Sequence, residues 1–282
     1  MNDTTTNETS SSAPDLADVR VTVLGAGNMG GAFVRAMLSA GVTAQNLRIV
    51  NSSEESSQRA AEELGASAGT PEDLSGADVI VLGVKPYQLE SVLPTVREAL
   101  QEDTVVVCIA AGTTLDSLAE PLGGHPQVLR AMPNTPMAIG EGVTHLMASP
   151  DASEASKDLA RALLSAAGIV VDLPEDKGHA MIGAAGSASA FVFTVVDAMI
   201  DEAVRQGLPR PEATRVILQT VKGASMLLQE TGDHPAVARG KVMSPGGTTA
   251  EGIAALEEAG IRPALAAAMN AAAQKSRAMS GE

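Results

Sequence analysis

The sequence predicts an α/β fold, in which a doubly wound sheet is followed by an all-α C-terminal domain. Short β-branched runs alternate with helical patterns from Val19 to Leu173, and after Pro174 only helical patterns follow. Apolar strands that alternate with helices are typical of a parallel sheet covered on both faces. We therefore expect a disordered leader over residues 1–18, an α/β domain over 19–174 and a helical domain over 175–282.

Each expected strand is a short apolar run rich in valine and isoleucine. The runs lie at 20–24, 47–51, 78–84, 104–110, 127–132, 143–147 and 169–173. Helical spacing marks stretches between several of these runs, at 30–40, 54–64, 88–100 and 152–167. Runs bounded by turn residues and separated by amphipathic helices are the pattern of βαβ units.

The second half of the chain is expected to be helical throughout. Its helical patterns lie at about 176–207, 211–230, 249–260 and 262–280. Pro211 fits the first turn of a helix, where its missing N–H costs nothing. The stretch 264–279 is apolar on more than one face, and a helix of this kind is buried on several faces. We therefore expect a homodimer, with assembly into a higher homo-oligomer left open.

The amino-acid composition limits which partners, metal sites and locations are expected for this chain. The chain has 282 residues, 45% of them hydrophobic and 1% aromatic, and a net charge of −15. An acidic chain without a basic cluster repels nucleic acid and anionic lipid, so neither is an expected partner. Cys108 is the only cysteine and the four histidines are scattered, so we expect no disulfide and no metal site. The polar N-terminus resembles no secretory signal and no apolar run reaches about 18 residues, which favours a cytoplasmic protein without a membrane span.

A glycine motif follows the first strand. Gly25, Gly27 and Gly30 form the pattern G-x-G-x-x-G, which follows a strand and opens a helix. In this context the glycines permit a tight turn, close approach to a pyrophosphate and close helix–strand packing. The alternative is an ordinary glycine-rich turn. The motif favours a Rossmann-type dinucleotide-binding domain.

The end of the second strand bears on which dinucleotide is bound. A site that prefers NAD has an acidic residue there for the ribose 2′-OH, whereas this chain has Asn51, Ser52 and Ser53. Small hydrogen-bonding side chains at this point favour NADPH. The loop has no arginine and is followed by Glu54 and Glu55, which leaves NADH open.

Further strand ends are expected to face the cofactor, because ligands sit beyond the carboxyl ends of strands in such sheets. These ends read "GVKPYQ", "IAAGTT" and "RAMPNTP", with small residues or proline rather than bulky side chains. Backbone could therefore approach a nicotinamide ribose closely. Lys85 is either a contact to a phosphate or ribose, or a solvated lysine before a turn.

The segment "MSPGGTTAEGIAALE" at 243–257 combines a helix start with surplus glycines. Thr248 and Glu251 have the spacing of a capping box. A helix start does not require Pro-Gly-Gly before it, and two glycines let the N–H groups of Gly247, Thr248 and Thr249 turn toward one point. Such a point holds a carboxylate or phosphate without any Lys or Arg. On the residues alone, a helix cap and an anion site remain equal alternatives.

Together these motifs resemble pyrroline-5-carboxylate reductase. The resemblance runs in order from about residue 20 to the end, through "GAGNMG" (25–30), "VKP" (84–86), "AAGTTL" (110–115), "RAMPNTP" (130–136) and "SPGGTTAEGIAALE" (244–257). It implies reduction of L-1-pyrroline-5-carboxylate to L-proline with NAD(P)H. It also implies a Rossmann domain followed by a helical domain that interlocks with a second subunit.

The resemblance also implies roles for residues. The substrate carboxylate and ring nitrogen would be held by Ser244, Gly247, Thr248 and Thr249, with Thr249 as the catalytic contact to the nitrogen. The cofactor would be lined by Gly27, Asn28, Met29, Ser52, Ser53, Val84, Lys85, Pro86, Ala110, Ala111 and Gly112. Thr70 lies where the family often has an adenosine-contacting asparagine.

One segment departs from the family, and two other functions stay open. The family usually reads Ser-Gly-Ser-x-Pro-Ala-Tyr where this chain reads "AGSASAF" (185–191), so Ser189 and Phe191 replace a proline and a tyrosine. A catalytically impaired NADP-binding protein is one alternative, supported by this segment alone. A 3-hydroxyacid dehydrogenase-like oxidoreductase is the other. It needs a lysine base with an asparagine one turn on, and Lys222 has no such asparagine.

Overall fold

The computed structural model describes residues 15–280 and divides the chain into two compact units. The first unit ends at Met181 and includes the chain end from Ser276, and the second runs from Ile182 to Lys275. Most of the expected leader, residues 1–14, lies outside the described residues. Packing begins close to its end, because Leu16 is buried in the core of the first unit.

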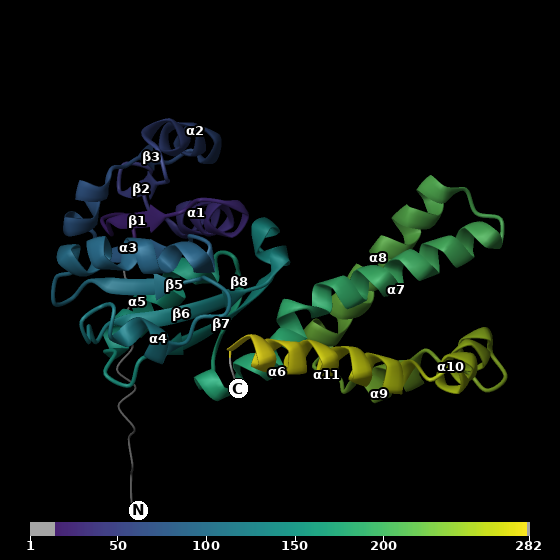
Figure 1. Ribbon diagram of the computed structural model, residues 1–282. Helices are drawn as coiled ribbons and strands as arrows, with labels where there is room; N and C mark the ends of the chain where they lie inside the picture. The colour runs from purple at the N-terminus through teal and green to yellow at the C-terminus, as the bar shows by residue number, and fades with distance from the viewer. Residues whose placement is uncertain (1–14, 281–282) are drawn as a thin grey trace, which may run out of the picture. The chain divides into compact units, whose positions relative to one another are not determined.

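The first unit is built on an eight-stranded sheet with the order β3-β2-β1-β4-β5-β6-β7-β8 (Figure 1). Its strands are β1 (Val21–Leu24), β2 (Leu47–Val50), β3 (Ser67–Ala68), β4 (Val79–Leu82), β5 (Val105–Cys108), β6 (Val128–Pro133), β7 (Gly142–Ala148) and β8 (Gly168–Asp172). Neighbouring strands are parallel except β6 and β7, which are antiparallel. The sheet, with the helical region after it, confirms the predicted α/β fold class.

The antiparallel pair corrects the expectation of a wholly parallel sheet. The connection from β6 to β7 holds only a short 3-10 helix, η2 (Thr135–Ile139). A parallel pair needs a crossover of a dozen or more residues, so a connection this short returns the chain in the opposite direction. The Asn134 side chain braces the turn, since its Oδ1 accepts from the Val143 N–H at 2.8 Å.

Helices cover both faces of the sheet, and alternate strand residues explain why. Val79 and Val81 join the core beneath one set of helices, whereas Ile80 and Leu82 join the core beneath the other. The first set is α1 (Asn28–Ala40), α2 (Glu54–Leu64) and α5 (Glu154–Ser165). The second set is α3 (Pro86–Ala99) and α4 (Leu115–Ala119). Because successive strand side chains point to opposite faces, a run of valine and isoleucine supplies both cores.

The remaining helices are mostly in the second unit. They are α6 (Gly178–Met181), which closes the first unit, then the π-helix η4 (Ile182–Gly186), α7 (Ala188–Arg205), α8 (Arg210–Thr231), α9 (Pro235–Lys241), α10 (Thr248–Glu258) and α11 (Ile261–Ser280). The helix expected at 176–207 is thus one helical stretch with a π-helical turn inside it. Helix α9 was not expected.

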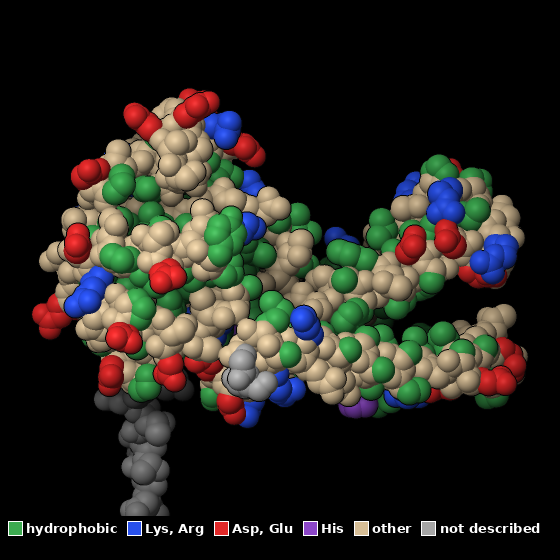
Figure 2. Space-filling view, in the orientation of Figure 1, with side chains coloured by type: hydrophobic (Ala, Val, Ile, Leu, Met, Phe, Trp, Pro, Cys, Tyr) green, Lys and Arg blue, Asp and Glu red, His purple; other side chains and the backbone are tan. Residues whose placement is uncertain are grey.

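The second unit has almost no core of its own. Within it, Ile200 and Ala213 are the described apolar residues that are buried. Its exposed large apolar side chains include Phe193, Leu227, Met226, Val242 and Leu256, and Figure 2 shows apolar side chains along the surface of these helices. Residues Glu175–Arg205 also form the one described stretch that is long and apolar enough to cross a membrane, although only 6% of its most apolar window is buried. Exposed apolar faces of this kind are typical of surfaces that pack against a partner.

Candidate active site

The glycine turn after β1 is shaped by close backbone contacts. Gly25 has a φ of +89°, and a Cβ there would lie 2.7 Å from the Val84 nitrogen on the neighbouring chain segment. A Cβ on Gly30 would lie 2.1 Å from the Gly25 carbonyl oxygen. A Cβ on Gly27, in contrast, would meet nothing within 4 Å. The outer glycines are therefore required by packing, whereas the middle one leaves open space above the backbone.

This open space lies at the start of helix α1. Gly27 is the N-cap, and no side chain caps the helix, so its first N–H groups are left for another acceptor. A helix N-terminus with free N–H groups and a clear approach suits a pyrophosphate. The residues present therefore fit the phosphate-binding part of a dinucleotide site.

A pocket of about 250 Å³ adjoins the turn at the carboxyl ends of the central strands. The expected cofactor residues that line it are Gly27, Asn28, Met29, Val84, Lys85, Pro86, Ala110 and Ala111. Gly112 follows directly on Ala111 with a φ of +76° and lies outside the lining. The rest of the lining belongs to the same three strand ends that the sequence predicted to face the cofactor, although the sequence assigned none of these residues an individual role: Gly83, Ile109, Arg130, Ala131, Met132 and Pro133. The fold thus joins strand ends far apart in the chain.

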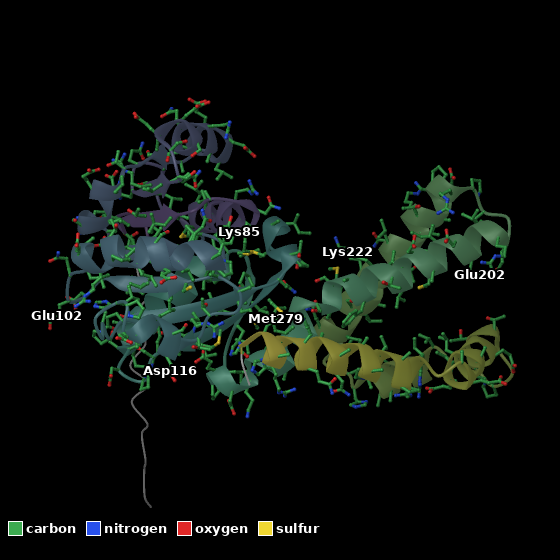
Figure 3. All side chains as sticks on the ribbon, in the orientation of Figure 1. Lys85, Glu102, Asp116, Glu202, Lys222 and Met279 are labelled. Carbon is green, nitrogen blue, oxygen red and sulfur yellow. The ribbon has the colours of Figure 1, made fainter. Side chains whose placement is uncertain are left out.

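Lys85 stands at the junction of β4 and α3, where its side chain is exposed (Figure 3). Its backbone N–H donates to the Gln88 Oε1 at 3.1 Å, which caps the helix that Pro86 opens. The backbone is therefore held in place while the ammonium group stays free to move. This leaves both expected interpretations of Lys85 open.

Of the three residues after β2, Asn51 and Ser53 stabilise the loop through hydrogen bonds, whereas Ser52 is exposed. The Asn51 side chain accepts from the Ala26 N–H at 2.9 Å and donates to the Ser56 carbonyl oxygen at 3.0 Å, which ties the glycine turn to α2. Ser53 caps α2 by accepting from the Ser56 N–H. Ser52 is exposed between them. Asn51 and Ser53 thus have structural contacts, and Ser52 is the side chain of this loop most available to a ligand.

Thr70 lies just beyond β3, next to β2 in the sheet. Its N–H and its hydroxyl both donate to the Asp73 carboxylate, at 2.7 and 3.3 Å. The residue is exposed and stands outside the 250 Å³ pocket. Its position therefore suits the outer, adenosine end of a dinucleotide site rather than the reacting end.

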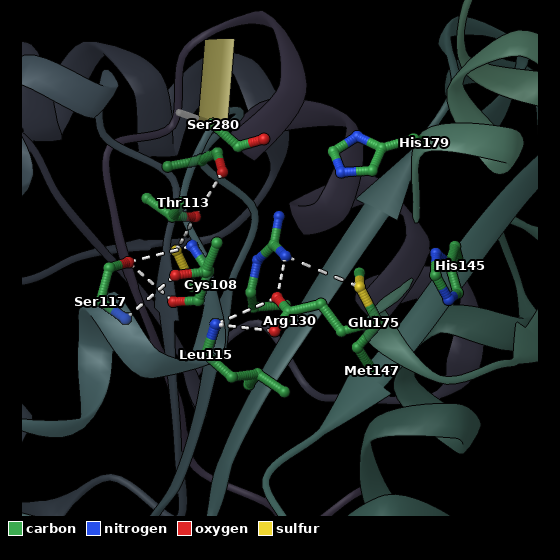
Figure 4. A network of polar contacts seen from close by, with 12 residues as sticks. Cys108, Thr113, Leu115, Ser117, Arg130, His145, Met147, Glu175, His179 and Ser280 are labelled. Atoms are coloured by element: carbon green, nitrogen blue, oxygen red, sulfur yellow. Dashed lines mark hydrogen bonds and ion pairs between the residues drawn. The ribbon is translucent and has the colours of Figure 1, made fainter. Parts of the chain in front are cut away.

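Arg130 and Cys108, on two neighbouring strands near the pocket, are both largely buried, which the sequence did not reveal. Arg130, on β6, is largely buried and forms an ion pair with Glu175 (Figure 4). Cys108, at the end of β5, is buried, and burial raises the pKa of its thiol. A thiol with a raised pKa is a poor nucleophile, so Cys108 serves packing. Among the described residues, no group of His, Cys, Asp and Glu is arranged to hold a metal ion.

In the segment before α10, the local structure favours glycine at both Gly246 and Gly247. Gly246 has a φ of +68°, which disfavours a side chain. A Cβ on Gly247 would lie 2.5 Å from the Ser244 Oγ, so glycine lets this hydroxyl fold against the turn. The side chains of Ser244, Thr248 and Thr249 are exposed. Within the second unit these expected substrate residues are therefore brought together around one helix start.

The capping box expected at Thr248 and Glu251 is wrong. The helix begins one residue earlier, so Gly247 is the N-cap and Thr248 is already helical. The Gly247 N–H also donates to the Ser244 carbonyl oxygen at 3.0 Å, which closes the turn. This N–H group is therefore not one of the free donors to an anion that the sequence predicted. The Ala250 and Glu251 N–H groups bond the Gly247 carbonyl oxygen. The N–H groups of Thr248 and Thr249 precede these bonds, so they remain the donors for a ligand.

The departing segment 185–191 spans the change from π-helix to α-helix. The Ser187 N–H donates to the Ile182 carbonyl oxygen at 2.7 Å, the bond of a π-turn, and α7 starts at Ala188. A Cβ on Gly183 would lie 2.8 Å from the Met269 carbonyl oxygen, so α11 approaches the π-turn closely. The helical path therefore forms here without the proline that the family usually has.

Comparison with known proteins identifies both halves of the chain. The family described as pyrroline-5-carboxylate reductase dimerisation matches residues 175–279. The family described as NADP oxidoreductase, coenzyme F420-dependent, matches residues 20–112. The first match covers the helices with exposed apolar faces, and the second covers the glycine turn and the strand ends that follow it.

Relatives match nearly the whole chain. A pyrroline-5-carboxylate reductase of Escherichia coli is 35% identical over 266 residues, 93% of this chain and 98% of that protein. Pyrroline-5-carboxylate reductase 3 of Danio rerio is 33% identical over 96% of this chain and 95% of its own length.

Solved structures agree. A pyrroline-5-carboxylate reductase from Coxiella burnetii has a TM-score of 0.87 at 30% identity, covering 93% of this chain and 98% of that one. A Plasmodium falciparum pyrroline carboxylate reductase with NADP bound has a TM-score of 0.83 at 25% identity, covering 94% and 99%.

Proposed function

Because the chain belongs to the pyrroline-5-carboxylate reductase family, we propose that it reduces the imine bond of L-1-pyrroline-5-carboxylate to give L-proline. This is an NAD(P)H-dependent oxidoreductase reaction on a CH–NH group and the last step of proline biosynthesis. Relatives at 33–35% identity over more than nine-tenths of the chain support it. The single structural observation that carries the proposal is the glycine turn with its open Gly27, beside a pocket at the strand ends.

The first unit binds the cofactor. When bound, NADPH supplies the hydride. The glycine turn holds the pyrophosphate through Gly27, Asn28 and Met29, while Gly25 and Gly30 keep the turn close to the sheet. The backbone of Val84, Pro86, Ala110, Ala111 and Gly112 borders the nicotinamide side, with Lys85 free to reach a phosphate or ribose.

NADPH is preferred over NADH. The exposed Ser52 and the first N–H groups of α2 offer donors to a 2′-phosphate, while Asn51 and Ser53 hold that loop in place. No acidic side chain stands at Asn51 to select the ribose 2′-OH of NADH. Thr70 lies on the same side, at the adenosine end.

The segment 244–249 holds the substrate. Its N–H groups at Thr248 and Thr249, with the hydroxyls of Ser244 and Thr248, suit a carboxylate without any Lys or Arg in the segment, in a chain with a net charge of −15. Gly247 supports this arrangement by leaving room for the Ser244 Oγ. Thr249 hydrogen-bonds the ring nitrogen, keeps the imine oriented and relays a proton to it from solvent.

Positioning and anion binding dominate over general acid catalysis in this proposal. Glu251 is the acidic residue in the first turn of α10. Since the expected capping box is absent, Glu251 is exposed and no longer committed to the helix start. Glu251 follows the N–H donors Thr248 and Thr249 within the same turn, so its carboxylate would repel rather than hold a substrate carboxylate. The site therefore works by orienting a protonated imine.

The active protein is a homodimer formed through the helical region, and it works in the cytoplasm. The match of residues 175–279 to a dimerisation family and the exposed apolar helix faces support the homodimer.

One assay separates this function from its rivals. NADPH consumption is measured with pyrroline-5-carboxylate, and NADP⁺ reduction is measured with a panel of 3-hydroxy acids. We expect turnover with the imine alone, and a higher kcat/KM with NADPH than with NADH. Oxidation of a 3-hydroxy acid would instead favour the dehydrogenase alternative, in which Lys222, exposed on α8 (Figure 3), would be the base to test. Tight NADPH binding without any turnover would favour the impaired protein.

A further inference from the structure

Arg130 is a cation buried in the wall of the cofactor pocket. It belongs to β6, lines the pocket beside Ala131 and Met132, and its side chain is 11% exposed. Burying a charge is unfavourable unless its hydrogen bonds are satisfied. The contacts of Arg130 therefore show whether it is a completed structural ion pair or a group that awaits a ligand.

The contacts of Arg130 are concentrated on one nitrogen. Nη1 donates to the Glu175 Oε1 and to the Met147 Sδ, the latter at 3.7 Å (Figure 4). Nε is buried without a hydrogen-bond partner. No contact to Nη2 is found among the described residues. An arginine has five N–H donors, so the contacts found within residues 15–280 leave part of this guanidinium unsatisfied.

Glu175 holds the guanidinium of Arg130 in place through its carboxylate. Its two carboxylate oxygens also accept from the Leu115 N–H, at 3.0 and 3.3 Å, at the start of α4. The same carboxylate therefore holds both Arg130 and the end of the 110–114 loop, whose first residues line the pocket. Arg130 is thus held in orientation before any ligand arrives, and its charge is neutralised by its partner.

The position in the sheet indicates which part of a ligand would meet Arg130. The pyrophosphate belongs at the glycine turn after β1, and the sheet continues from β1 through β4 and β5 to β6. The adenosine side lies in the other direction, toward β2 and β3. Arg130 therefore stands on the nicotinamide side of the pyrophosphate.

Resting on the proposed NADPH-dependent function, we infer that Arg130 is a cofactor-binding residue for the nicotinamide half. Its unused N–H groups donate to an acceptor oxygen of that half, and Glu175 holds it in place. The pairing also has an electrostatic reason. An oxidised nicotinamide ring carries a positive charge, which a lone arginine nearby would repel. Arg130 paired with Glu175 provides hydrogen-bond donors with little net charge.

The test compares a whole cofactor with its adenosine half. Dissociation constants for NADPH and for 2′,5′-ADP are measured by calorimetry on the wild-type protein and on Arg130→Lys, which keeps the charge beside Glu175 but loses the planar set of donors. We expect NADPH to bind about tenfold or more weakly, the worth of one charge-assisted hydrogen bond, with 2′,5′-ADP binding unchanged. Unchanged NADPH binding, or equal weakening of both ligands, would overturn the inference.

Two further variants sharpen the test. Arg161→Lys is the matched control, because Arg161 is also ion-paired in the same unit, with Asp158 and Asp172, but lies outside the pocket lining. It should change neither affinity. Glu175→Gln leaves the charge of Arg130 unneutralised, so NADP⁺ binding should weaken more than NADPH binding. Equal effects on the two would contradict the electrostatic role. These are binding measurements, so a failure here is distinct from a failure of turnover with pyrroline-5-carboxylate.

Discussion

At the residue scale, Thr249 shows how a helix start combines two kinds of donor. It is the second residue of α10, so its backbone N–H precedes the first intrahelical bonds and its hydroxyl is exposed beside it. Such a residue can bind an anion with its backbone and a ring nitrogen with its side chain. The two roles can be separated, because only the hydroxyl is removed by substitution.

Removal of the hydroxyl should affect turnover and spare the cofactor. We expect Thr249→Ala to lower kcat by about 10- to 100-fold, since it removes a hydrogen bond to a charged group in the reacting complex. NADPH affinity should stay at the wild-type value. Thr249→Ser, which retains the hydroxyl, is the control and should keep most of the activity. Steady-state kinetics and calorimetry decide the matter, and an unchanged kcat in Thr249→Ala would remove Thr249 from the mechanism.

At the scale of elements, the glycines in the turn between β1 and α1 have different roles. Gly30 brings α1 close to the turn, because any side chain there would collide with the Gly25 carbonyl oxygen. Gly27 has no such neighbour and a φ of −72°, which every residue can adopt. The structure thus separates a glycine needed for packing from one whose side is open, where we propose that the phosphates bind.

Two alanine substitutions test this separation. Gly30→Ala should lower the free energy of unfolding by about 1–3 kcal/mol, as overpacking does. Gly27→Ala should unfold like the wild-type protein but bind NADPH about tenfold or more weakly, since the methyl group fills the space that a phosphate approaches. Urea unfolding and calorimetry measure the two effects. A destabilised Gly27→Ala protein with normal affinity would reverse this assignment.

At the scale of the whole molecule, the helical unit matches a dimerisation family and exposes apolar side chains. Phe193 on α7 is 63% exposed and Leu227 on α8 is 55% exposed, in a unit with few buried apolar residues. Apolar surface of this extent is typical of a permanent interface between subunits. Phe193 also lies in the Glu175–Arg205 stretch, which is long and apolar enough to meet the length of a membrane span.

Charges on this surface should separate the subunits. We expect Phe193→Asp and Leu227→Asp to shift the protein from dimer to monomer at micromolar concentration, with loss of reductase activity. Phe193→Leu keeps an apolar side chain and should remain dimeric. Sizing with light scattering reads out the state, and dimeric behaviour of both aspartate variants would place the interface elsewhere.

The sequence by itself determined the features that depend on local patterns. Valine-rich runs between amphipathic helices specified the covered sheet, and the glycine spacing specified a dinucleotide turn, because both arise from residues near one another in the chain. The segment 244–257 likewise revealed a helix start with special backbone needs. Even there the predicted cap was one residue late, since the Gly247 N–H closes a turn on Ser244 that no spacing rule shows.

Only the tertiary structure decided what depends on distant residues. Strand β7 runs antiparallel to β6 because the connection between them is too short for a crossover. Strand β3 consists of two residues that no sequence pattern predicted to be a strand, and it pairs with β2. Asn51 was predicted as a cofactor contact, and the fold adds a bracing role, because its side chain accepts from the Ala26 N–H in the glycine turn. Arg130 and Glu175 are 45 residues apart, and although Arg130 lies in a strand end expected to face the cofactor, nothing in the sequence pairs it with Glu175. They meet in the pocket wall because β6 ends beside the segment that follows β8, and sequence spacing carries no information on such a meeting.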